Sequence, residues 1–258
     1  MVRICVFASS SQQTPTAYLT GAARLGMLLA QGGHVCVNGG GRSGGMGALN
    51  SAVAAGGGEI VGVIHKRWVV DEVEFAVERA GGKGSRMLVF DGDDLAARKR
   101  GLRDACDAII VLPGGPGTWD ELFELVALRQ LGMSALPICL VNIDGYYDGF
   151  VEQLRRAQAD AVIKVSAAML LPVFATVDDA LEWTLGQLRD GPCLELARAA
   201  EASRLSYREG ASHGAAAALA AARGALPALD ARGRTRAASA VCCVALGFAL
   251  GAAFARPR

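Results

Sequence analysis

Residues 112–123 constrain this chain most, because they join an apolar segment, a glycine-rich turn and a helix start. Residues 108–111 are wholly apolar, which is typical of a buried parallel strand. Residues 113–117 read Pro-Gly-Gly-Pro-Gly, and Thr118 then begins a predicted helix with Glu121 in its first turns. Such a turn can point several backbone N–H groups at one spot, where the positive end of the helix dipole also acts. The pattern predicts an anion site, most often for phosphate, with a carboxylate beside it.

A purely structural interpretation of this stretch is that glycines permit a tight turn and that Asp120 and Glu121 complement the helix dipole. Three glycines within residues 114–117 exceed what a turn requires, so the pattern favours a functional site.

Apolar segments alternate with helix-like segments along residues 1–190. The predicted strands are residues 3–8, 35–37, 60–64, 86–90, 108–112, 136–141 and 171–175. The predicted helices are residues 14–30, 47–55, 94–105, 118–131, 150–160 and 177–188. Apolar rather than alternating strands predict a doubly wound α/β fold, a parallel sheet with helices on both faces. Ligands of such sheets bind at the carboxyl ends of the strands.

The composition divides the rest of the chain into two further parts. Residues 191–236 are Ala-rich and predict a helical extension. Residues 237–258 form a tail in which 237–255 are apolar except for Ser239, and that run of about 19 residues is long enough to span a bilayer. Gly247 and Gly251 have the spacing of membrane helix pairs. The alternatives to a C-terminal membrane anchor are a helix packed on the domain and an unstructured tail.

Charge and cysteine content narrow the classes of function. Lys+Arg 26 against Asp+Glu 25 leaves a net charge of +1, so no long-range field favours nucleic acid or an anionic membrane. The seven cysteines are an odd number without metal-ligand spacing, which predicts buried free thiols and no metal site. The first residues lack the pattern of a secretory signal. We therefore expect a cytoplasmic, reducing compartment.

Further candidates lie near the other strand ends. Residues 38–47, Asn-Gly-Gly-Gly-Arg-Ser-Gly-Gly-Met-Gly, loosely match a dinucleotide fingerprint, although they follow the second strand rather than the first. Arg98 belongs to a basic run that is either a solvated helix face or a contribution to the same crevice. Ser9–Ser11 either offer hydroxyls to a ligand or simply end the first strand. The three histidines are not spaced for metal.

Several motifs together resemble one family. Residues 113–121, Pro-Gly-Gly-x-Gly-Thr-x-x-Glu, are similar to the signature of the "Lonely Guy" proteins, cytokinin-activating phosphoribohydrolases that are often labelled lysine decarboxylases. The resemblance extends from residue 4 to about 188. Its other motifs are Asn38-Gly39-Gly40-Gly41, Gly44-x-Met46-Gly47, Gly62-Val63-Ile64, Arg98-Lys99 and Asp144-Gly145-Tyr146-Tyr147-Asp148.

The resemblance implies a homodimeric, Rossmann-like enzyme that needs no cofactor. It would hydrolyse the N-glycosidic bond of a nucleoside 5′-monophosphate to free base and ribose 5-phosphate. Arg98 and Glu121 match the catalytic pair of the family. The implied substrate-binding residues are Ser10, Gly40, Gly41, Met46, Glu72 and Lys99, together with Gly114, Gly115, Gly117 and Thr118 of the phosphate turn.

Four residues depart from the family pattern. Ser9 replaces a glycine, His65 a proline, Ala96 a histidine and Ala127 a threonine. We expect Ala96 and Ala127 to border the pocket, which leaves the preferred base open between cytokinin nucleotides, AMP and other purine monophosphates.

The main alternative is a carrier of the same fold that binds a nucleotide-like ligand without hydrolysing it. The intact Arg98/Glu121 pair favours hydrolysis, because a carrier needs no such pair. Lysine decarboxylation is not indicated, since no lysine has the setting of a pyridoxal Schiff base.

Overall fold

The computed structural model describes residues 1–69 and 81–190. Glu72, the predicted extension at 191–236 and the predicted tail at 237–258 lie outside the described residues. Among the helices of the described part, none is both long enough and apolar enough to cross a bilayer.

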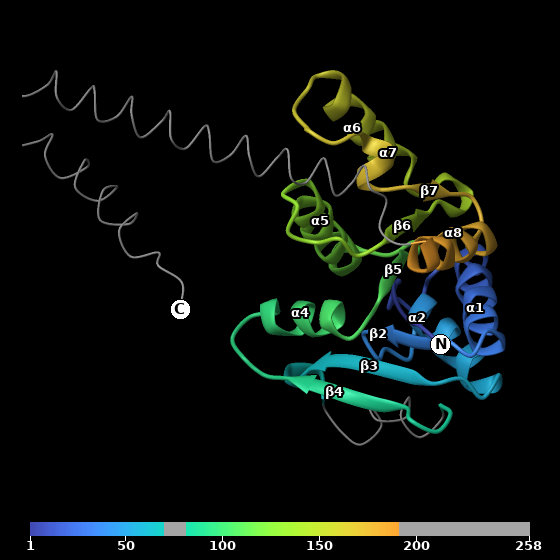
Figure 1. The fold of residues 1–258 in the computed structure, drawn as a ribbon. Helices are drawn as coiled ribbons and strands as arrows, with labels where there is room; N and C mark the ends of the chain where they lie inside the picture. Colours follow the sequence, from blue (N-terminus) through green and yellow to red (C-terminus); the bar gives the residue numbers. More distant parts are fainter. Residues whose placement is uncertain (70–80, 191–258) are drawn as a thin grey trace, which may run out of the picture. The chain divides into compact units, whose positions relative to one another are not determined.

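A seven-stranded sheet, parallel throughout, forms the centre of the fold (Figure 1). In chain order the strands are β1 (Arg3–Phe7), β2 (Val35–Asn38), β3 (Ile60–His65), β4 (Arg86–Phe90), β5 (Ala108–Val111), β6 (Ile138–Val141) and β7 (Val173–Phe174). Their order across the sheet is β4-β3-β2-β1-β5-β6-β7. The chain moves outward from β1 in one direction through β2 to β4, and then in the other direction from β5 to β7. The reversal between β1 and β5 opens a crevice at the carboxyl ends of these strands.

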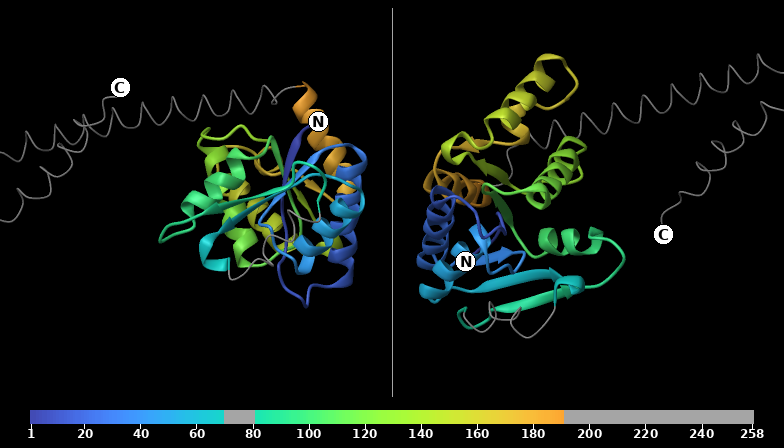
Figure 2. Two further views of the ribbon diagram at one scale, coloured as in Figure 1. Left: turned by 90° about the horizontal axis from the view of Figure 1, so that it is seen from below. Right: turned by 180° about the vertical axis from the view of Figure 1, so that it is seen from behind.

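Helices cover both faces of the sheet, as the views in Figure 2 show. The helical elements are α1 (Thr16–Gln31), α2 (Gly44–Ala55), η1 (Lys66–Trp68), α4 (Ala96–Asp104), α5 (Pro116–Gln130), η3 (Ile143–Gly145), α6 (Asp148–Ala159), α7 (Ala167–Leu170) and α8 (Val177–Asp190). Helices α1, α2 and α8 share one apolar core, and α4, α5 and α6 share the other. The predicted doubly wound α/β fold is confirmed.

Strand β1 shows why its sequence suits the centre of the sheet. Its side chains alternate between the two cores: Ile4 and Val6 belong to one, Cys5 and Phe7 to the other. All four are at most 5% exposed. A strand buried on both faces needs apolar residues at every position, which explains the continuous apolar segments of the sequence.

The predicted boundaries differ from the observed ones chiefly at the helix starts. Helix α5 begins at Pro116 rather than Thr118, because proline is well suited to the first helical position. Helix α2 begins at Gly44 rather than residue 47. The short elements η1, η3 and α7 were not predicted, since three or four residues carry no detectable periodicity.

The buried side chain of Arg129 joins α5 to α7 and to the segment before β6. This side chain of α5 is 5% exposed, and its guanidinium donates to the carbonyls of Leu170 at 3.0 Å, Leu136 at 2.6 Å and Met169 at 2.9 Å. Burial lowers its pKa to about 10. Arg129→Met keeps the apolar stem and leaves three carbonyls without their donor, so it should lower the free energy of unfolding by about 3 kcal/mol in urea titrations.

Arg156→Met is the matched control. Arg156 lies on the exposed side of α6, where it pairs with Asp160, so its loss should change the free energy of unfolding by less than about 0.5 kcal/mol. Equal effects of the two substitutions would contradict a structural role for Arg129.

Candidate active site

A cavity of about 390 Å³ lies at the carboxyl ends of the central strands. The ends of β1, β2 and β3, the turn after β5, and side chains of α4 and α5 line it. The cavity therefore occupies the crevice that the strand order creates between β1 and β5.

A buried ion pair between α4 and α5 dominates the chemistry of this cavity. Arg98 Nη1 lies 2.8 Å from Glu121 Oε1, and each side chain is only 12% exposed. Arg98 Nε also donates to the carbonyl of Val63 at 3.1 Å, and its guanidinium carbon lies 5.5 Å from the centre of the Trp68 ring. The structure thus brings together the two residues that the sequence predicts as a catalytic pair, 23 positions apart.

Burial and Arg98 act in opposite directions on Glu121. Burial raises the pKa of this carboxyl above its ordinary value of 4.5, and the nearby Arg98 charge lowers the pKa in part. The carboxylate is therefore held by one fixed cation in a site with little water, where it interacts strongly with any positive charge that develops beside it.

Gly39 makes room for the guanidinium. A Cβ at this position would lie 2.7 Å from Arg98 Nη2 and 3.1 Å from Met46 Sδ. Any larger residue after β2 would displace Arg98. Gly39 belongs to the second glycine-rich turn, but it was not among the predicted site residues.

The N-terminus of α5 is the predicted anion site. Its N-cap is Gly115, and no side chain caps it, so the N–H groups of the first turn remain available to a ligand. A Cβ at Gly115 or Gly117 would meet nothing within 4 Å, and both residues line the cavity. Neither residue has a positive φ. These two glycines are therefore not needed for the backbone conformation, and they leave space at the helix end.

The second glycine-rich turn has a different role, because Ser9 already occupies the end of α2. The N–H of Gly45 donates to Ser9 Oγ at 3.0 Å, and the N–H of Met46 donates to the Ser9 carbonyl at 3.0 Å. Ser9 Oγ also bonds to Thr14 Oγ1 at 2.8 Å. Of the two helix ends that the glycine turns create, the one at α5 is thus free to bind an anion.

Two tyrosines after β6 donate hydrogen bonds to backbone carbonyls of the turn that precedes α5. Tyr146 Oη donates to the Gly114 carbonyl at 2.6 Å, and Tyr147 Oη donates to the Leu112 carbonyl at 2.8 Å. The side chain of Asn142 accepts the N–H of Tyr147 at 2.7 Å. The Asp-Gly-Tyr-Tyr-Asp motif at 144–148, which had no assigned role in the sequence, therefore holds the turn in place.

The predicted substrate-binding residues divide into two groups. Those that line the cavity with Arg98 and Glu121 are Ser10, Gly41, Met46, Gly115, Gly117 and Thr118. Gly40, Gly114 and Lys99 do not line it. Gly40, with a φ of +73°, shapes the turn after β2, and Gly114 passes closely against the Thr118 side chain.

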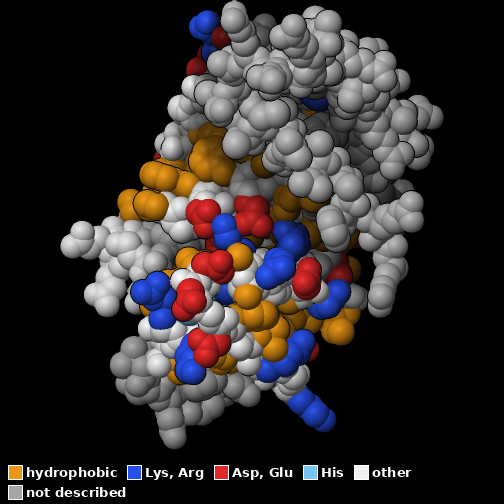
Figure 3. Space-filling view, turned by 90° about the vertical axis from the view of Figure 1, so that its left-hand side faces the viewer, with side chains coloured by type: hydrophobic (Ala, Val, Ile, Leu, Met, Phe, Trp, Pro, Cys, Tyr) orange, Lys and Arg blue, Asp and Glu red, His pale blue; other side chains and the backbone are white. Residues whose placement is uncertain are grey.

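Lys99 contacts the outer side of α5. Its Nζ lies 3.1 Å from Asp120 Oδ1 and 2.7 Å from Glu124 Oε2. Figure 3 shows acidic and basic side chains next to one another on this side of the molecule. Arg103, also on α4, pairs with Glu124 at 3.4 Å. Lys99 therefore joins α4 to α5, while its neighbour Arg98 points into the cavity.

The family departures Ala96 and Ala127 do not border the pocket as expected: both are exposed, and neither lines the cavity. Conversely, Ile64 and Trp68 line the cavity and were missed. Their position in the sequence could have indicated them, since Ile64 ends a predicted strand and Trp68 follows shortly after it.

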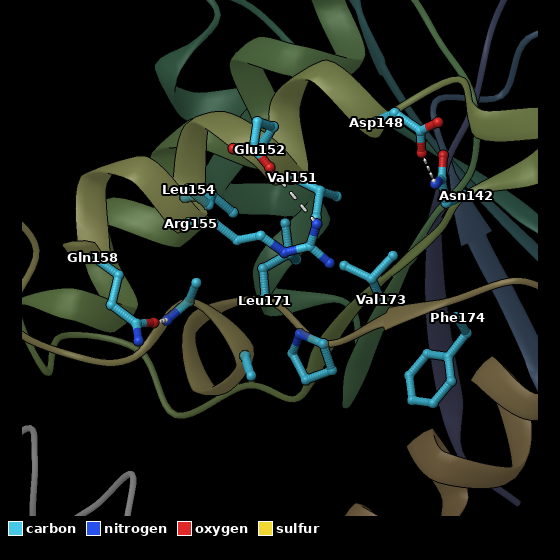
Figure 4. A pocket seen from close by; sticks show the side chains of 13 residues that line it. Asn142, Asp148, Val151, Glu152, Leu154, Arg155, Gln158, Leu171, Val173 and Phe174 are labelled. Atoms are coloured by element: carbon cyan, nitrogen blue, oxygen red, sulfur yellow. Dashed lines mark hydrogen bonds and ion pairs between the residues drawn. The ribbon is translucent and has the colours of Figure 1, made fainter.

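A larger cavity of about 800 Å³ lies between α6 and the α7–β7 segment (Figure 4). Its polar side chains bind one another or the backbone: Asn142 with Asp148 at 2.7 Å, Arg155 with Glu152 at 3.7 Å, and Gln158 with the N–H of Ala167 at 2.7 Å. The smaller cavity, with its uncapped helix end and buried ion pair, is the better candidate site despite its size.

The described residues contain no cluster of three or more His, Cys, Asp or Glu side chains able to hold a metal ion. The four cysteines found in the described ranges, Cys5, Cys36, Cys106 and Cys139, are buried free thiols.

The fold and the site define a parallel α/β protein with an uncapped helix end beside a buried guanidinium–carboxylate pair. A family model described as "Possible lysine decarboxylase" matches residues 46–183. A rice protein (Oryza sativa subsp. japonica) named a probable cytokinin riboside 5′-monophosphate phosphoribohydrolase is 36% identical over 180 residues, which cover 70% of this chain and 69% of the relative. A cytokinin riboside 5′-monophosphate phosphoribohydrolase of Arabidopsis thaliana is 36% identical over 169 residues, 66% of this chain and 75% of the relative. The chain belongs to this Lonely Guy family.

Solved structures show the same fold at lower sequence identity. A molybdenum cofactor carrier protein from Chlamydomonas reinhardtii aligns with a TM-score of 0.52 and 20% identity over 74% of this chain and 99% of its own. A molybdenum cofactor binding protein from Rippkaea orientalis aligns with a TM-score of 0.51 and 18% identity over 72% of this chain and 96% of its own. At this identity the similarity establishes the shared fold alone.

Gly117→Ala tests the anion site without disturbing the fold. The added methyl group meets no protein atom but occupies the space at the helix end, so it should weaken the binding of ribose 5-phosphate about tenfold in calorimetry, with an unchanged Tm. Gly149→Ala is the matched control: it is also the second residue of a helix, α6, with nothing within 4 Å, and it does not line the cavity. Unchanged binding by the Gly117 variant would exclude this helix end as the phosphate site.

Proposed function

We propose that this protein hydrolyses the N-glycosidic bond of a nucleoside 5′-monophosphate and releases the free base and ribose 5-phosphate. The observation that carries this proposal is the buried Arg98–Glu121 pair next to the uncapped end of α5. The relatives named as cytokinin riboside 5′-monophosphate phosphoribohydrolases support it.

The N-terminus of α5 binds the 5′-phosphate. Its free N–H groups and dipole favour an anion, and Gly115 and Gly117 let the phosphate approach the backbone closely. Ser10 and Thr118 line the same cavity, although the Thr118 hydroxyl donates to the Ala8 carbonyl at 3.3 Å and so also anchors the helix to the end of β1.

Glu121 lies one helical turn beyond the phosphate site. Gly117 and Glu121 are four residues apart, hence on one face of α5 and separated by a rise of about 6 Å. A ribose whose phosphate binds at the helix end is therefore placed beside this carboxylate. As the bond to the base breaks, positive charge develops on the sugar ring, and the carboxylate stabilises it or orients the water that adds to C1′. The base leaves with a proton.

Arg98 holds the carboxylate and clamps the substrate. Hydrogen bonds to the Val63 carbonyl and to Glu121 fix the position of the guanidinium. The orientation of its remaining N–H groups is therefore set before a ligand binds. A fixed planar fork of donors suits substrate hydroxyl or phosphate oxygens. Arg98 also lowers the pKa of Glu121 in part, in opposition to the larger effect of burial.

A carrier that binds the nucleotide without hydrolysis is the alternative, and incubation with nucleotides distinguishes the two. The protein is incubated with AMP, isopentenyladenosine monophosphate and other nucleoside monophosphates while free base and ribose 5-phosphate are measured. Release of both products supports the hydrolase, and the relative rates rank the bases. Release from none of them, with retained binding, supports the carrier.

The proposal includes a homodimer in a reducing, cytoplasmic compartment. Helix α5 exposes the apolar side chains of Trp119 (42%) and Phe123 (52%), the second packed edge-on against Phe150, and such a face suits contact with a second copy. The buried free thiols suit a reducing compartment.

Glu121→Gln tests the catalytic role. Loss of the negative charge removes the stabilisation of the cationic sugar, so kcat should fall at least about 100-fold while the fold is retained. Glu124→Gln is the control: this carboxylate lies one turn further along α5, pairs with Lys99 and Arg103, and does not line the cavity. Near-normal hydrolysis by the Glu121 variant would rule out the assignment.

The raised pKa of Glu121 predicts a pH dependence. The active carboxylate is ionised, so activity is complete above its pKa and falls as the pH drops through it. Since burial places this pKa above the ordinary 4.5, the acid limb of kcat should have its midpoint above pH 4.5. The rates are measured at saturating substrate, so that protonation of the free nucleotide does not contribute to the pH profile. A midpoint at or below 4.5, or a limb displaced by Glu124→Gln, would contradict Glu121 as the titrating group.

A further inference from the structure

Trp68 is an exposed aromatic side chain at the cavity for which the proposed reaction has no role so far. It ends the short helix η1 directly after β3, lines the cavity and is 44% exposed. Its ring lies over the Arg98 guanidinium, 5.5 Å from ring centre to Cζ. A large aromatic surface left open to a cavity is available for stacking on a ligand.

The backbone at the end of β3 holds Trp68 in this position. His65 is 4% exposed, and its Nδ1 accepts the N–H of Arg67 at 3.2 Å. Nε2 therefore carries the ring proton in neutral His65 and donates to the Gly92 carbonyl at 3.1 Å. The N–H of Val69 closes the turn on the Lys66 carbonyl at 2.9 Å. The imidazole packs edge-on against Trp68, with ring centres 6.0 Å apart.

The groups that line the cavity follow one another in a fixed order. Gly117 marks the anion site, and Glu121 lies one helical turn further along α5. Arg98 is paired with Glu121, and Trp68 lies over Arg98. A nucleoside monophosphate has its parts in the same order: phosphate, ribose, base. With the phosphate at Gly117 and the ribose at Glu121, the base reaches Trp68.

The side chains near this end of the cavity suit a flat apolar ring. Ile64 and Met46 line the cavity together with Trp68. Stacking of a base on an aromatic side chain depends on the overlapping ring area and not on the polar groups at the edge of the base. Such a surface separates large bases from small ones but tolerates substituents on the ring.

We propose that Trp68 is the base-recognition residue of this site, stacking on the leaving base. This inference rests on the proposed function, because it takes the positions of phosphate and ribose from it.

Steady-state kinetics with AMP and UMP test the inference. Trp68→Leu keeps an apolar side chain but removes the ring, so the KM for AMP should rise about tenfold, and the KM for UMP should rise less because its single ring has less area to stack. Trp68→Phe should recover most of the AMP affinity. Trp183→Leu, which removes a tryptophan of α8 outside the cavity, should leave both KM values unchanged.

Inhibition by ribose 5-phosphate separates recognition of the base from a general effect on the site. This product has no base, so its inhibition constant should be the same for Trp68→Leu and for the unmodified protein. An equal rise of this constant and of the KM for AMP would show that Trp68 acts through Arg98 or the phosphate site, and would overturn the proposal. An unchanged KM for AMP in Trp68→Leu would overturn it as well.

Tryptophan fluorescence tests the stacking even if no nucleotide is hydrolysed. The chain has three tryptophans, so Trp119→Phe combined with Trp183→Phe leaves Trp68 as the only one. AMP should quench its emission and ribose 5-phosphate should not. Quenching without release of base from any nucleotide would remove the hydrolase proposal but retain the base contact. Absence of quenching by AMP would remove the base contact whatever the activity.

Discussion

The buried ion pair between Arg98 and Glu121 is the interaction on which the rest of the site depends. Removing two charges from water costs several kcal/mol for each ion, and only good geometry with further hydrogen bonds offsets that cost. Here the Val63 carbonyl takes the guanidinium Nε–H, Trp68 covers the guanidinium, and Gly39 leaves room beside it. The ends of β2 and β3 and the helices α4 and α5 must therefore converge, and the strand order brings them to one edge of the sheet.

The two glycine-rich turns show how similar sequence patterns serve different purposes. At α2, Ser9 binds the N–H groups of Gly45 and Met46, so the protein itself satisfies the helix end. At α5 no side chain caps the helix, and glycines keep the space in front of it open. The turn at α2 is therefore closed by the protein's own hydrogen bonds, whereas the N-terminus of α5 has no side-chain cap. This difference is the basis of the proposed orientation of the substrate, with its phosphate at α5 and its base at Trp68.

Much of the fold and part of the site could be predicted because they depend on local patterns. Buried parallel strands need continuous apolar residues, and Pro113, Gly114 and Gly115 mark the turn after one of them. Prediction failed where neighbouring residues point in different directions. Arg98 and Lys99 adjoin in the chain, yet α4 turns Arg98 towards Glu121 and Lys99 towards Asp120 and Glu124. The place of Arg98 in the crevice was predicted correctly, but the sequence did not show that Lys99, the next residue, contacts the outer side of α5 instead of the cavity.

The sequence by itself determined the class of sheet, the glycine-rich turn before α5 and the family, since each depends on patterns of residues that are close together in the chain. Only the tertiary structure decided which residues share the cavity. Trp68 meets Arg98 because α4 packs against β3, and Arg98 meets Glu121 because α4 and α5 cover the same face. Lys99, Ala96 and Ala127 lie outside the cavity for the same reason. Contacts between distant segments follow from the packing of layers, and no local pattern of side chains records them.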